Sequence, residues 1–374
     1  MRRVAQKRIF LSPPFVGTAE RAAIAAAFDS KYVAPCGPMV DAFERRLAAL
    51  AGRKHAVAVA SGTAALDLAM AEYGVDRRWT VIAPTLTFIA TVGPAYHRGA
   101  KLVFVDCDAT GNVDVRLLER ALADAKGRTL VVGVDLYGRC CDYDAIGALC
   151  DRHGAVFVCD AAEAVGATYK GRPSGSAGAV AVYSFNGNKI VTTSGGGALL
   201  TDDDGIAARA RKRSQQAREP AVWYEHKEVG YNYRLSNLLA AVGLAQLGRL
   251  AKILSKRRRI WETYGADGRL APVAGENHWL TVKLLASEAE RDAALARLAA
   301  ANIEARPVWK PLHLQPVFRR CRVYGGAVAA DLFARGICLP SGTGMTTADV
   351  TRVKRALAGI VGGGSPLARA SRAS

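Results

Sequence analysis

Short apolar runs alternate with longer amphipathic stretches between residues 55 and 201, and this alternation limits the possible folds more than any other feature of the sequence. The runs are rich in β-branched residues, and most lack polar alternation, as strands buried on both faces do. The stretches 113–126 and 142–153 have helical spacing and separate several of the runs. Strand and helix in alternation predict an α/β fold with a mostly parallel central sheet flanked by helices. The expected strands are 55–60, 80–84, 101–106, 129–134, 155–160, 180–185 and 197–201.

The pattern changes after about residue 205, where helical spacing dominates. A long helical stretch covers 235–264, and a shorter strand-and-helix section follows it. A chain of 374 residues has room for about two domains at roughly 150 residues each. We therefore expect a large domain over 1–250, a smaller C-terminal α+β domain over 251–362 and a flexible tail rich in glycine, serine and arginine over 363–374. The elements expected in the second domain are 279–285, 288–301 and 349–360.

Composition excludes several classes of protein. The residues are 50% hydrophobic and 22% charged, a mixture that buries a large core and rules out wholesale disorder or a collagen-like repeat. No apolar run approaches the ~20 residues needed to cross a bilayer. The basic start of the chain lacks the apolar stretch of a signal peptide. We therefore expect a cytoplasmic protein without membrane insertion.

The chain is strongly basic, because 51 lysines and arginines minus 33 aspartates and glutamates give +18 at pH 7. Such a charge suits nucleic acid, a membrane surface or an anionic small substrate. The charges are spread along the chain apart from a cluster at 256–259, and no helix-turn-helix, zinc-finger or RNP-like motif accompanies them. A solvated arginine-rich surface, with no nucleic-acid partner, is the favoured interpretation.

The eight cysteines raise the question of a metal site. Cys150 and His153 have ligand-like spacing, and Cys140, Cys141 and Cys159 lie nearby in the sequence. No second C-x-x-C or H-x-x-H half follows, and Cys159 falls inside an apolar run. Reduced, buried thiols explain the pattern more simply, so we predict no metal.

Polar residues follow several of the apolar runs, and ligands of a parallel sheet bind at the carboxyl ends of its strands. Gly62 and Thr63 follow the first run and open a predicted helix, whose N-terminus suits a phosphate. Asp160 ends another run, with Glu163 shortly after it. A buried carboxylate is costly unless it meets a cation or a donor, such as the protonated nitrogen of a pyridine ring. An ordinary helix cap is the structural alternative at both places.

Lys189 follows the buried run that ends near Ser184 and precedes a Thr-Thr-Ser cluster and three glycines. A lysine in a cleft forms Schiff bases, whereas a lysine in a surface hairpin is merely solvated. A pyridoxal-phosphate site requires a Schiff-base lysine, a carboxylate for the ring nitrogen and a phosphate cup. Lys189, Asp160 and the Gly62-Thr63 turn offer all three, each near the end of a predicted strand.

With these residues in place, the sequence resembles the DegT/DnrJ/EryC1/StrS family of sugar-nucleotide aminotransferases, which are fold-type-I pyridoxal-phosphate enzymes. The resemblance extends from about residue 9 to residue 361. The matching stretches include Leu11-Ser-Pro-Pro, Ala60-Ser-Gly-Thr, Asp135-Leu-Tyr-Gly138, Asp160-Ala-Ala-Glu163, Phe185-Asn-Gly-Asn-Lys189 and Arg306-Pro-Val-Trp-Lys-Pro-Leu-His313.

The resemblance implies two catalytic residues. Lys189 is similar to the lysine that forms the Schiff base and moves protons, and Asp160 to the partner of the pyridine nitrogen, whose charge keeps the ring protonated. Glu163 matches the position near the cofactor's phenolic oxygen, where many relatives have glutamine.

The remaining implied contacts fall into two groups. For the cofactor they are Phe88 stacked on the ring and Gly62, Thr63, Ser184 and Asn232 at the phosphate. Asn232 resembles a residue donated by the partner subunit, which implies a homodimer with shared active sites. For the sugar they are Asn188, Trp309 and His313, with a purely structural role as the alternative for each.

The lysine stretch is most similar to family members that aminate C4 of a 4-keto-6-deoxy sugar nucleotide. The resemblance implies that an amino group moves from L-glutamate to the sugar, with UDP-4-keto-6-deoxy-GlcNAc as the expected substrate, for surface polysaccharide or glycan biosynthesis. One departure is Phe15, where several of those enzymes carry histidine.

Rival functions have weaker support. Family members that act at C3 tend to have Pro-Gly-Lys-Asn-Leu-Gly around the lysine, and family dehydratases carry histidine in place of Lys189. A pyridoxal-phosphate-dependent regulator needs an added DNA-binding domain, for which the stretch before Ser61 is too short. A basic nucleic-acid-binding protein is the alternative from a different class, and salt-dependent DNA binding would favour it.

Overall fold

We analysed a computed structural model, which describes residues 7–358. Within this range, an eight-stranded sheet has the order β1-β9-β8-β5-β4-β2-β3-β12. The strand β9 pairs antiparallel with both neighbours, and the other neighbouring pairs are parallel. The strands are β1 His55–Val59, β2 Trp79–Pro84, β3 Lys101–Val105, β4 Arg128–Val134, β5 Val156–Asp160, β8 Val180–Ser184, β9 Gly197–Thr201 and β12 Arg322–Tyr324. The predicted mostly parallel α/β sheet is confirmed.

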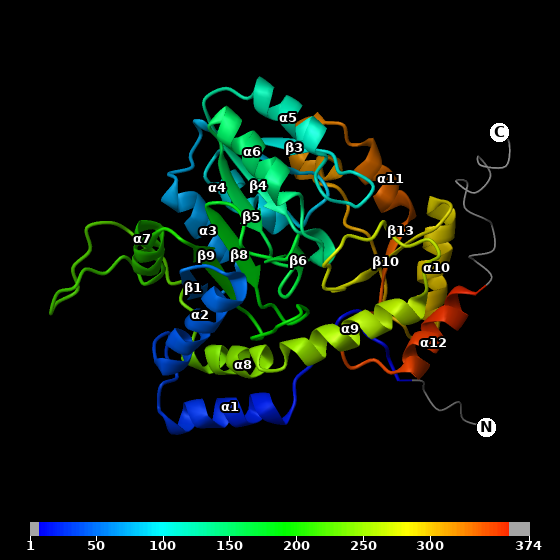
Figure 1. The fold of residues 1–374 in the computed structure, drawn as a ribbon, viewed down its shortest axis with the longest axis horizontal. Helices are drawn as coiled ribbons and strands as arrows, with labels where there is room; N and C mark the ends of the chain where they lie inside the picture. The colour runs from blue at the N-terminus through cyan, green and yellow to red at the C-terminus, as the bar shows by residue number, and fades with distance from the viewer. Residues whose placement is uncertain (1–6, 359–374) are drawn as a thin grey trace.

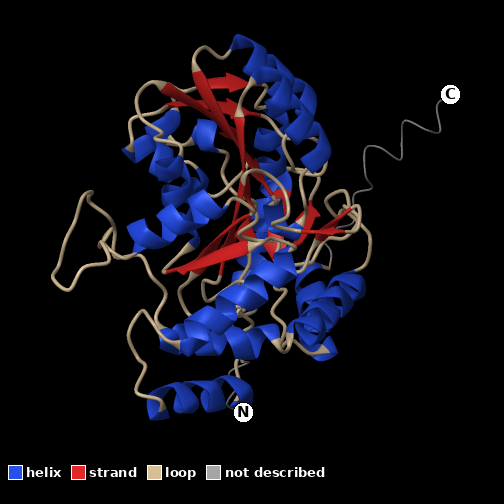
Figure 2. Cartoon of the chain, turned by 60° about the vertical axis from the view of Figure 1, so that its left-hand side comes forward, coloured by secondary structure: helices blue, strands red, loops and turns tan. Residues whose placement is uncertain are grey.

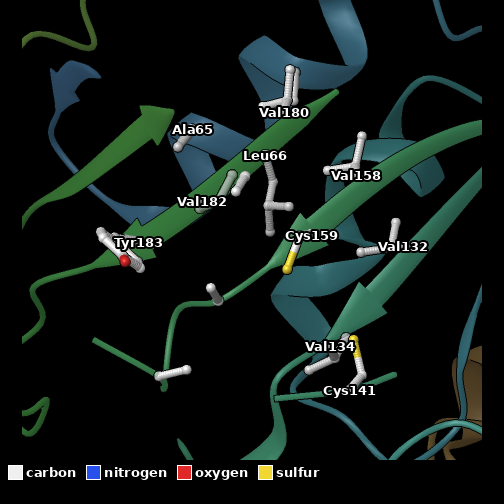
Figure 3. Close-up of a cluster of buried hydrophobic side chains, with 14 of the residues drawn as sticks. Ala65, Leu66, Val132, Val134, Cys141, Val158, Cys159, Val180, Val182 and Tyr183 are labelled. Atoms are coloured by element: carbon white, nitrogen blue, oxygen red, sulfur yellow. The ribbon is translucent and has the colours of Figure 1, made fainter. Parts of the chain in front are cut away.

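Helices lie on both sides of the sheet (Figure 2). The helices α5 and α6 pack on each other and on β3 to β5, whereas α3 packs on β8 and β9. Figure 3 shows Ala65 and Leu66 of α3 beside the valines of β5 and β8. The helices of this part are α1 Thr18–Asp29, α2 Pro38–Ala51, α3 Gly62–Glu72, α4 Gly93–His97, α5 Val115–Asp124, α6 Tyr143–His153 and α7 Asp204–Ser214, with short 3-10 turns at Ile89–Thr91 (η1) and Leu136–Gly138 (η2).

Side-chain caps explain where several helices begin. Asp114, Asp142 and Asp203 accept hydrogen bonds from the first turns of α5, α6 and α7, as N-cap residues do. Ser61 caps α3 in the same way through the N–H of Ala64, so this helix begins at Gly62. The amphipathic stretches therefore start close to where the sequence predicts.

The stretch 235–264 is two helices rather than one, which corrects the sequence prediction. The helix α8 covers Asn237–Leu247 and α9 covers Leu250–Tyr264, and they meet at a bend of 62°. The helix α8 is apolar and packs on α1 and α2, whereas α9 crosses to α12 (Figure 1). The break at Gly248 and Arg249 lets each helix follow its own packing surface. No single helix among residues 7–358 has the length and apolar character of a membrane span; α8 and α9 pass that test only together.

A second hydrophobic core surrounds a three-stranded sheet with the order β10-β13-β11. It contains residues of α10 and α12, and also Ile9, which pairs with Ile303. The elements are β10 Thr281–Leu284, β11 Arg306–Pro307, β13 Gly336–Leu339, α10 Glu288–Ala300, α11 Ala327–Arg335 and α12 Thr347–Leu357, with 3-10 turns at Leu312–Leu314 (η3) and Pro316–Phe318 (η4). A further small hairpin pairs β6 Thr168–Tyr169 with β7 Arg172–Pro173.

The domain boundary at residue 250 stays a prediction. Two segments pack against the part of the chain on the other side of this boundary. Ile9 belongs to the second core although it lies in the expected large domain. Strand β12 lies in the expected small domain but extends the edge of the large sheet beside β3. The expected tail at 363–374 lies outside the described residues.

Candidate active site

The carboxyl ends of β4, β5 and β8 form the floor of the candidate site. These strands are parallel neighbours, so the residues that follow them meet at one edge of the sheet. Asp160 ends β5, Ser184 ends β8, and the turn η2 with Tyr137 follows β4. All three side chains are buried. The polar residues that follow these apolar runs in the sequence therefore lie at one edge of the sheet.

Asp160 is held by hydroxyl and amide donors. The hydroxyl of Thr91 donates to its Oδ2 at 2.7 Å, and the N–H of Ala162 donates to its Oδ1 at 3.2 Å. The hydroxyl of Thr87 lies 2.8 Å from that of Thr91 and orients it. Burial raises the pKa of Asp160, while the bond from Thr91 and the charge of Lys189 oppose this shift. The carboxylate is oriented and desolvated, the state in which a cationic partner is most favourable.

Glu163 and Lys189 form an ion pair close to Asp160. The Nζ of Lys189 lies 3.4 Å from Oε1 of Glu163, and the backbone N–H of Tyr137 donates to Oε2 at 2.7 Å. Burial raises the pKa of Glu163, and the charge of Lys189 and the Tyr137 N–H oppose this shift. The amine also lies 4.1 Å from the centroid of the Trp279 ring, within cation–π range. The Lys189 side chain is only 13% exposed, so it is not the fully solvated lysine of the surface-hairpin alternative.

Gly62, Thr63 and Ser184 come together at the N-terminus of α3. A Cβ at Gly62 would lie 3.0 Å from the Cβ of Ser184, a tight contact, so glycine favours this close approach of helix and strand. Helix geometry leaves the N–H groups of Gly62 and Thr63 without intrahelical partners. With the hydroxyl of Ser184 beside them, they form a cradle of donors with the chemistry of a phosphate site.

Three aromatic rings continue from Trp279 toward the exposed side of the site. The ring of Tyr137 lies between Trp279 and Trp309, with ring centroids 6.3 and 6.4 Å away. Its hydroxyl accepts a hydrogen bond from the backbone N–H of Trp309 at 2.9 Å. Phe88 follows β2, is 48% exposed, and lies 4.9 Å from the Trp309 ring. The indole nitrogen of Trp309 is buried without a hydrogen-bond partner.

A cavity of about 850 Å³ adjoins this aromatic row. Its walls include Asn188 and Trp309 from the predicted sugar-side residues, together with the cations Arg306 and Lys310. The lining comes from segments far apart in the sequence: 10–14, Tyr137, Asn188, 279–280, Glu304, 306–310, Phe333 and Cys338. The volume is that of a small-molecule site.

His313 and Asn232 do not line this cavity. The Nδ1 of His313 lies 2.6 Å from the hydroxyl of Thr85, and burial lowers the pKa of the imidazole. A Cβ at Gly326 would lie 3.1 Å from its Nε2, so this edge of the half-buried ring packs against Gly326. The side chain of Asn232 is exposed and accepts a hydrogen bond from Gln216 within its own chain.

The cysteine cluster matches the simpler interpretation. Cys140, Cys141, Cys150 and Cys159 are buried, whereas His153 is exposed on α6. Among residues 7–358, no group of three histidines, cysteines, aspartates or glutamates is arranged to hold a metal ion. Phe15, the departure from related sequences, packs against the cations of Arg249 and Lys256 at 4.6 and 4.8 Å.

Sequence reasoning missed several residues of the site. The sequence did not single out Thr91, which contacts Asp160, or Trp279, which contacts Lys189. Ser12 and Trp279 bind the carbonyl of Asn188, and Arg257 contacts both. The available signals were the stretch 85–88, which follows a predicted strand and closely precedes Thr91, and the matching stretch Leu11-Ser-Pro-Pro, which contains Ser12.

Comparisons with known proteins agree with this geometry. Residues 15–358 match the model of the DegT/DnrJ/EryC1/StrS aminotransferase family. EpsN of Bacillus subtilis, named for pyridoxal phosphate-dependent aminotransferase activity, is 46% identical over 365 residues, covering 93% of this chain and 94% of its own. GDP-perosamine synthase of Caulobacter vibrioides is 38% identical over 363 residues, covering 94% and 97%. The crystal structure of DesI in the presence of its TDP-sugar product superposes with a TM-score of 0.87 at 31% identity, covering 98% of this chain and 96% of that one.

The fold and the site thus define a pyridoxal-phosphate-dependent aminotransferase. The chain belongs to the DegT/DnrJ/EryC1/StrS aminotransferase family. The predicted family, fold, enzyme class and cofactor are confirmed.

The residues present fit pyridoxal phosphate. The close approach of Gly62 and Ser184 leaves a donor cradle for the phosphate. The buried Asp160 carboxylate suits a protonated ring nitrogen, and the Lys189 amine suits the aldehyde.

Proposed function

We propose that this enzyme transfers an amino group from L-glutamate to C4 of a 4-keto-6-deoxy sugar nucleotide, with UDP-4-keto-6-deoxy-GlcNAc as the substrate, for surface polysaccharide or glycan biosynthesis. The observation that carries the proposal is the Lys189 amine, held between the Glu163 carboxylate and the Trp279 ring beside a cavity of about 850 Å³. The likeness to GDP-perosamine synthase supports a sugar-nucleotide acceptor.

When bound, pyridoxal phosphate supplies an electron sink for the carbanion that transamination generates. Lys189 would hold the cofactor through its Nζ, and the same nitrogen would accept and donate protons as general base and acid. Glu163 lies within reach of its Nζ and accepts a hydrogen bond from it. The ring of Trp279 limits where the free amine can go.

Asp160 keeps a negative charge at the bottom of the site. Thr91 holds one carboxylate oxygen and the N–H of Ala162 holds the other, so the group cannot rotate away. Burial excludes water, which strengthens its attraction for a cationic ring nitrogen. Gly62, Thr63 and Ser184 would hold the phosphate by backbone and hydroxyl donors.

The cavity suits the sugar nucleotide. Trp309 offers a ring face for the sugar, and Arg306 and Lys310 offer positive charge for a pyrophosphate. Asn188 lies at the cavity wall next to Lys189, so it is positioned to contact the acceptor sugar. The basic net charge of the chain favours such an anionic substrate.

A homodimer is part of the proposal. The loop after α7 extends away from the body of the chain (Figures 1 and 2) and carries exposed apolar side chains, with Val222 97% and Val229 96% exposed. Trp223 and Tyr224 on the same loop are also exposed. Apolar groups of this kind mark interaction surfaces, and Asn232 follows this loop directly. A second copy would cover the loop and receive Asn232 at its phosphate site.

The test is a half-reaction. The enzyme is loaded with pyridoxamine phosphate and mixed with UDP- and TDP-linked 4-keto-6-deoxy sugars and with a 3-keto sugar nucleotide, while the cofactor absorbance is followed. We expect conversion to the pyridoxal form with 4-keto sugars, fastest with the UDP-linked 2-acetamido sugar. Conversion by the 3-keto sugar alone would refute the C4 assignment. Reverse loading with L-glutamate, L-aspartate and L-alanine identifies the donor.

A further inference from the structure

The backbone carbonyl of Asn188, the residue before Lys189, accepts two hydrogen bonds from distant segments. The hydroxyl of Ser12 donates to it at 2.7 Å, and the indole N–H of Trp279 donates at 2.7 Å. A carbonyl oxygen has two lone pairs, so both are used. The peptide that leads into the lysine is therefore fixed from two directions.

Arg257 orders both donors. Its guanidinium is buried, and it donates to the hydroxyl of Ser12 at 3.1 Å and to the backbone carbonyl of Trp279 at 2.7 Å. Arginine has donors and no acceptor, so the Ser12 oxygen must accept from it. The hydroxyl hydrogen of Ser12 is then directed at Asn188. A third bond, to the hydroxyl of Thr343 at 2.9 Å, completes the anchoring of the guanidinium.

Trp279 reaches the side chain of the lysine as well as its backbone. Its ring centroid lies 4.1 Å from Nζ of Lys189. The ring cannot swing freely, because its indole N–H is bound to Asn188 and its backbone N–H is bound to the side chain of Asn277 at 2.9 Å. Asn277 in turn donates to the backbone carbonyl of Glu163 at 2.9 Å. One short segment therefore contacts both members of the Lys189–Glu163 pair.

We propose that Ser12, Trp279 and Arg257 form a clamp that positions Lys189 by fixing the peptide of Asn188 and by giving the amine a ring face to rest on. These are positioning residues, since they act through Asn188 and Lys189. The inference rests on the proposed role of Lys189 as the cofactor lysine. A lysine has four rotatable side-chain bonds, and a clamped backbone reduces the volume that its amine searches before it meets the aldehyde.

The test measures how fast the full-length apoprotein captures pyridoxal phosphate. Schiff-base absorbance gives the rate, and borohydride reduction followed by peptide mass analysis identifies the labelled lysine. The variants are Ser12→Ala, Trp279→Phe and the double variant, because phenylalanine keeps a ring face but has no N–H. Arg257 is left intact, since loss of a buried cation endangers folding.

We expect each single variant to slow capture by about fivefold, the size of one net hydrogen bond. The double variant should slow it by more than the product of the two, because the carbonyl then loses its last partner. Ser12→Thr keeps the hydroxyl and should restore the rate. The matched control is Ser30→Ala with Trp261→Phe, two residues outside the clamp, and its capture rate should equal that of the wild type.

Three results would overturn the clamp alone: labelling of Lys189 in the double variant at a rate within twofold of the wild type, equal slowing in the control, or a loss of rate that only follows loss of folded protein by circular dichroism. Borohydride labelling of the wild type at a lysine other than Lys189 would instead overturn the proposed function, and the clamp with it. The two failures are therefore distinguishable.

Discussion

The floor of the site and the cavity beside it are built in different ways. The floor draws Asp160 and Ser184 from the ends of adjacent strands and Glu163 from the turn after β5, and all three are buried. The cavity draws its walls from the N-terminal segment 10–14, from 304–310 and from Phe333, and much of its lining is apolar. Under the proposed function, the floor would provide the chemistry of transamination and the cavity would provide the shape that selects a substrate. Substitutions in the floor should therefore change kcat, and substitutions in the cavity should change KM.

The largest effect is expected from Lys189→Ala. Loss of the amine removes both the covalent attachment and the proton carrier, and kcat should fall by at least about 1,000-fold. Sugar amination by the glutamate-driven reaction measures it, with circular dichroism to confirm folding. Lys170→Ala, which removes an exposed lysine paired with Asp144, serves as the matched control and should stay near wild type. Turnover of Lys189→Ala within tenfold of the wild type would contradict the assignment.

Asp160→Asn should have the next largest effect. The amide keeps the size of the side chain but removes the charge that faces the ring nitrogen, and kcat should fall by roughly 100- to 1,000-fold. Steady-state kinetics with the 4-keto sugar nucleotide measure the change. Asp151→Asn on the exposed part of α6 is the control. A rise in KM with kcat preserved would show that Asp160 acts in substrate binding rather than in the chemical step. The proposed division between floor and cavity would then be wrong.

Trp309→Leu tests the cavity in the same assay. The aromatic wall loses one ring face, so KM for the sugar nucleotide should rise about tenfold while kcat stays within about threefold. Val317→Leu, at an exposed site on η4, controls for a new leucine in this region. A fall in kcat with an unchanged KM would place Trp309 with the floor instead.

The smallest effect on activity is expected from Asp135→Asn, beneath the floor. Burial raises the pKa of Asp135 to about 7, although bonds from Tyr143 and Cys141 oppose the shift. A raised pKa means that the folded protein binds this proton more tightly than the unfolded chain. The resulting stability is present below about pH 4 and is lost as the pH rises through 7.

The asparagine variant has no such titration. Its melting temperature relative to the wild type should therefore rise between pH 5 and pH 8, by the equivalent of about 3 kcal/mol or less. Thermal unfolding at matched ionic strength measures the difference. A difference that stays constant over this pH range would show that Asp135 does not titrate in the folded protein.

The same division explains what the sequence could predict. Asp160, Lys189 and the Gly62-Thr63 turn were identified because each follows an apolar run, and topology alone brings strand ends together. Ser12 and Trp279 were not identified, because they meet Asn188 across 176 and 91 residues of chain, and no local pattern encodes such a contact. The break between α8 and α9 was missed for a similar reason: both halves have helical spacing, and the packing of neighbouring helices decides the bend.

The amino-terminal segment has a practical consequence for anyone who re-engineers this enzyme. Ile9 pairs with Ile303, the carbonyl of Leu11 binds Ser341, and Pro13 lines the cavity. Removing the residues before α1 would expose the second core, which contains Ile9, and would remove the part of the cavity wall formed by residues 10–14. Affinity tags therefore belong ahead of this segment and never in its place, and directed evolution of acceptor preference has a compact target in residues 10–14.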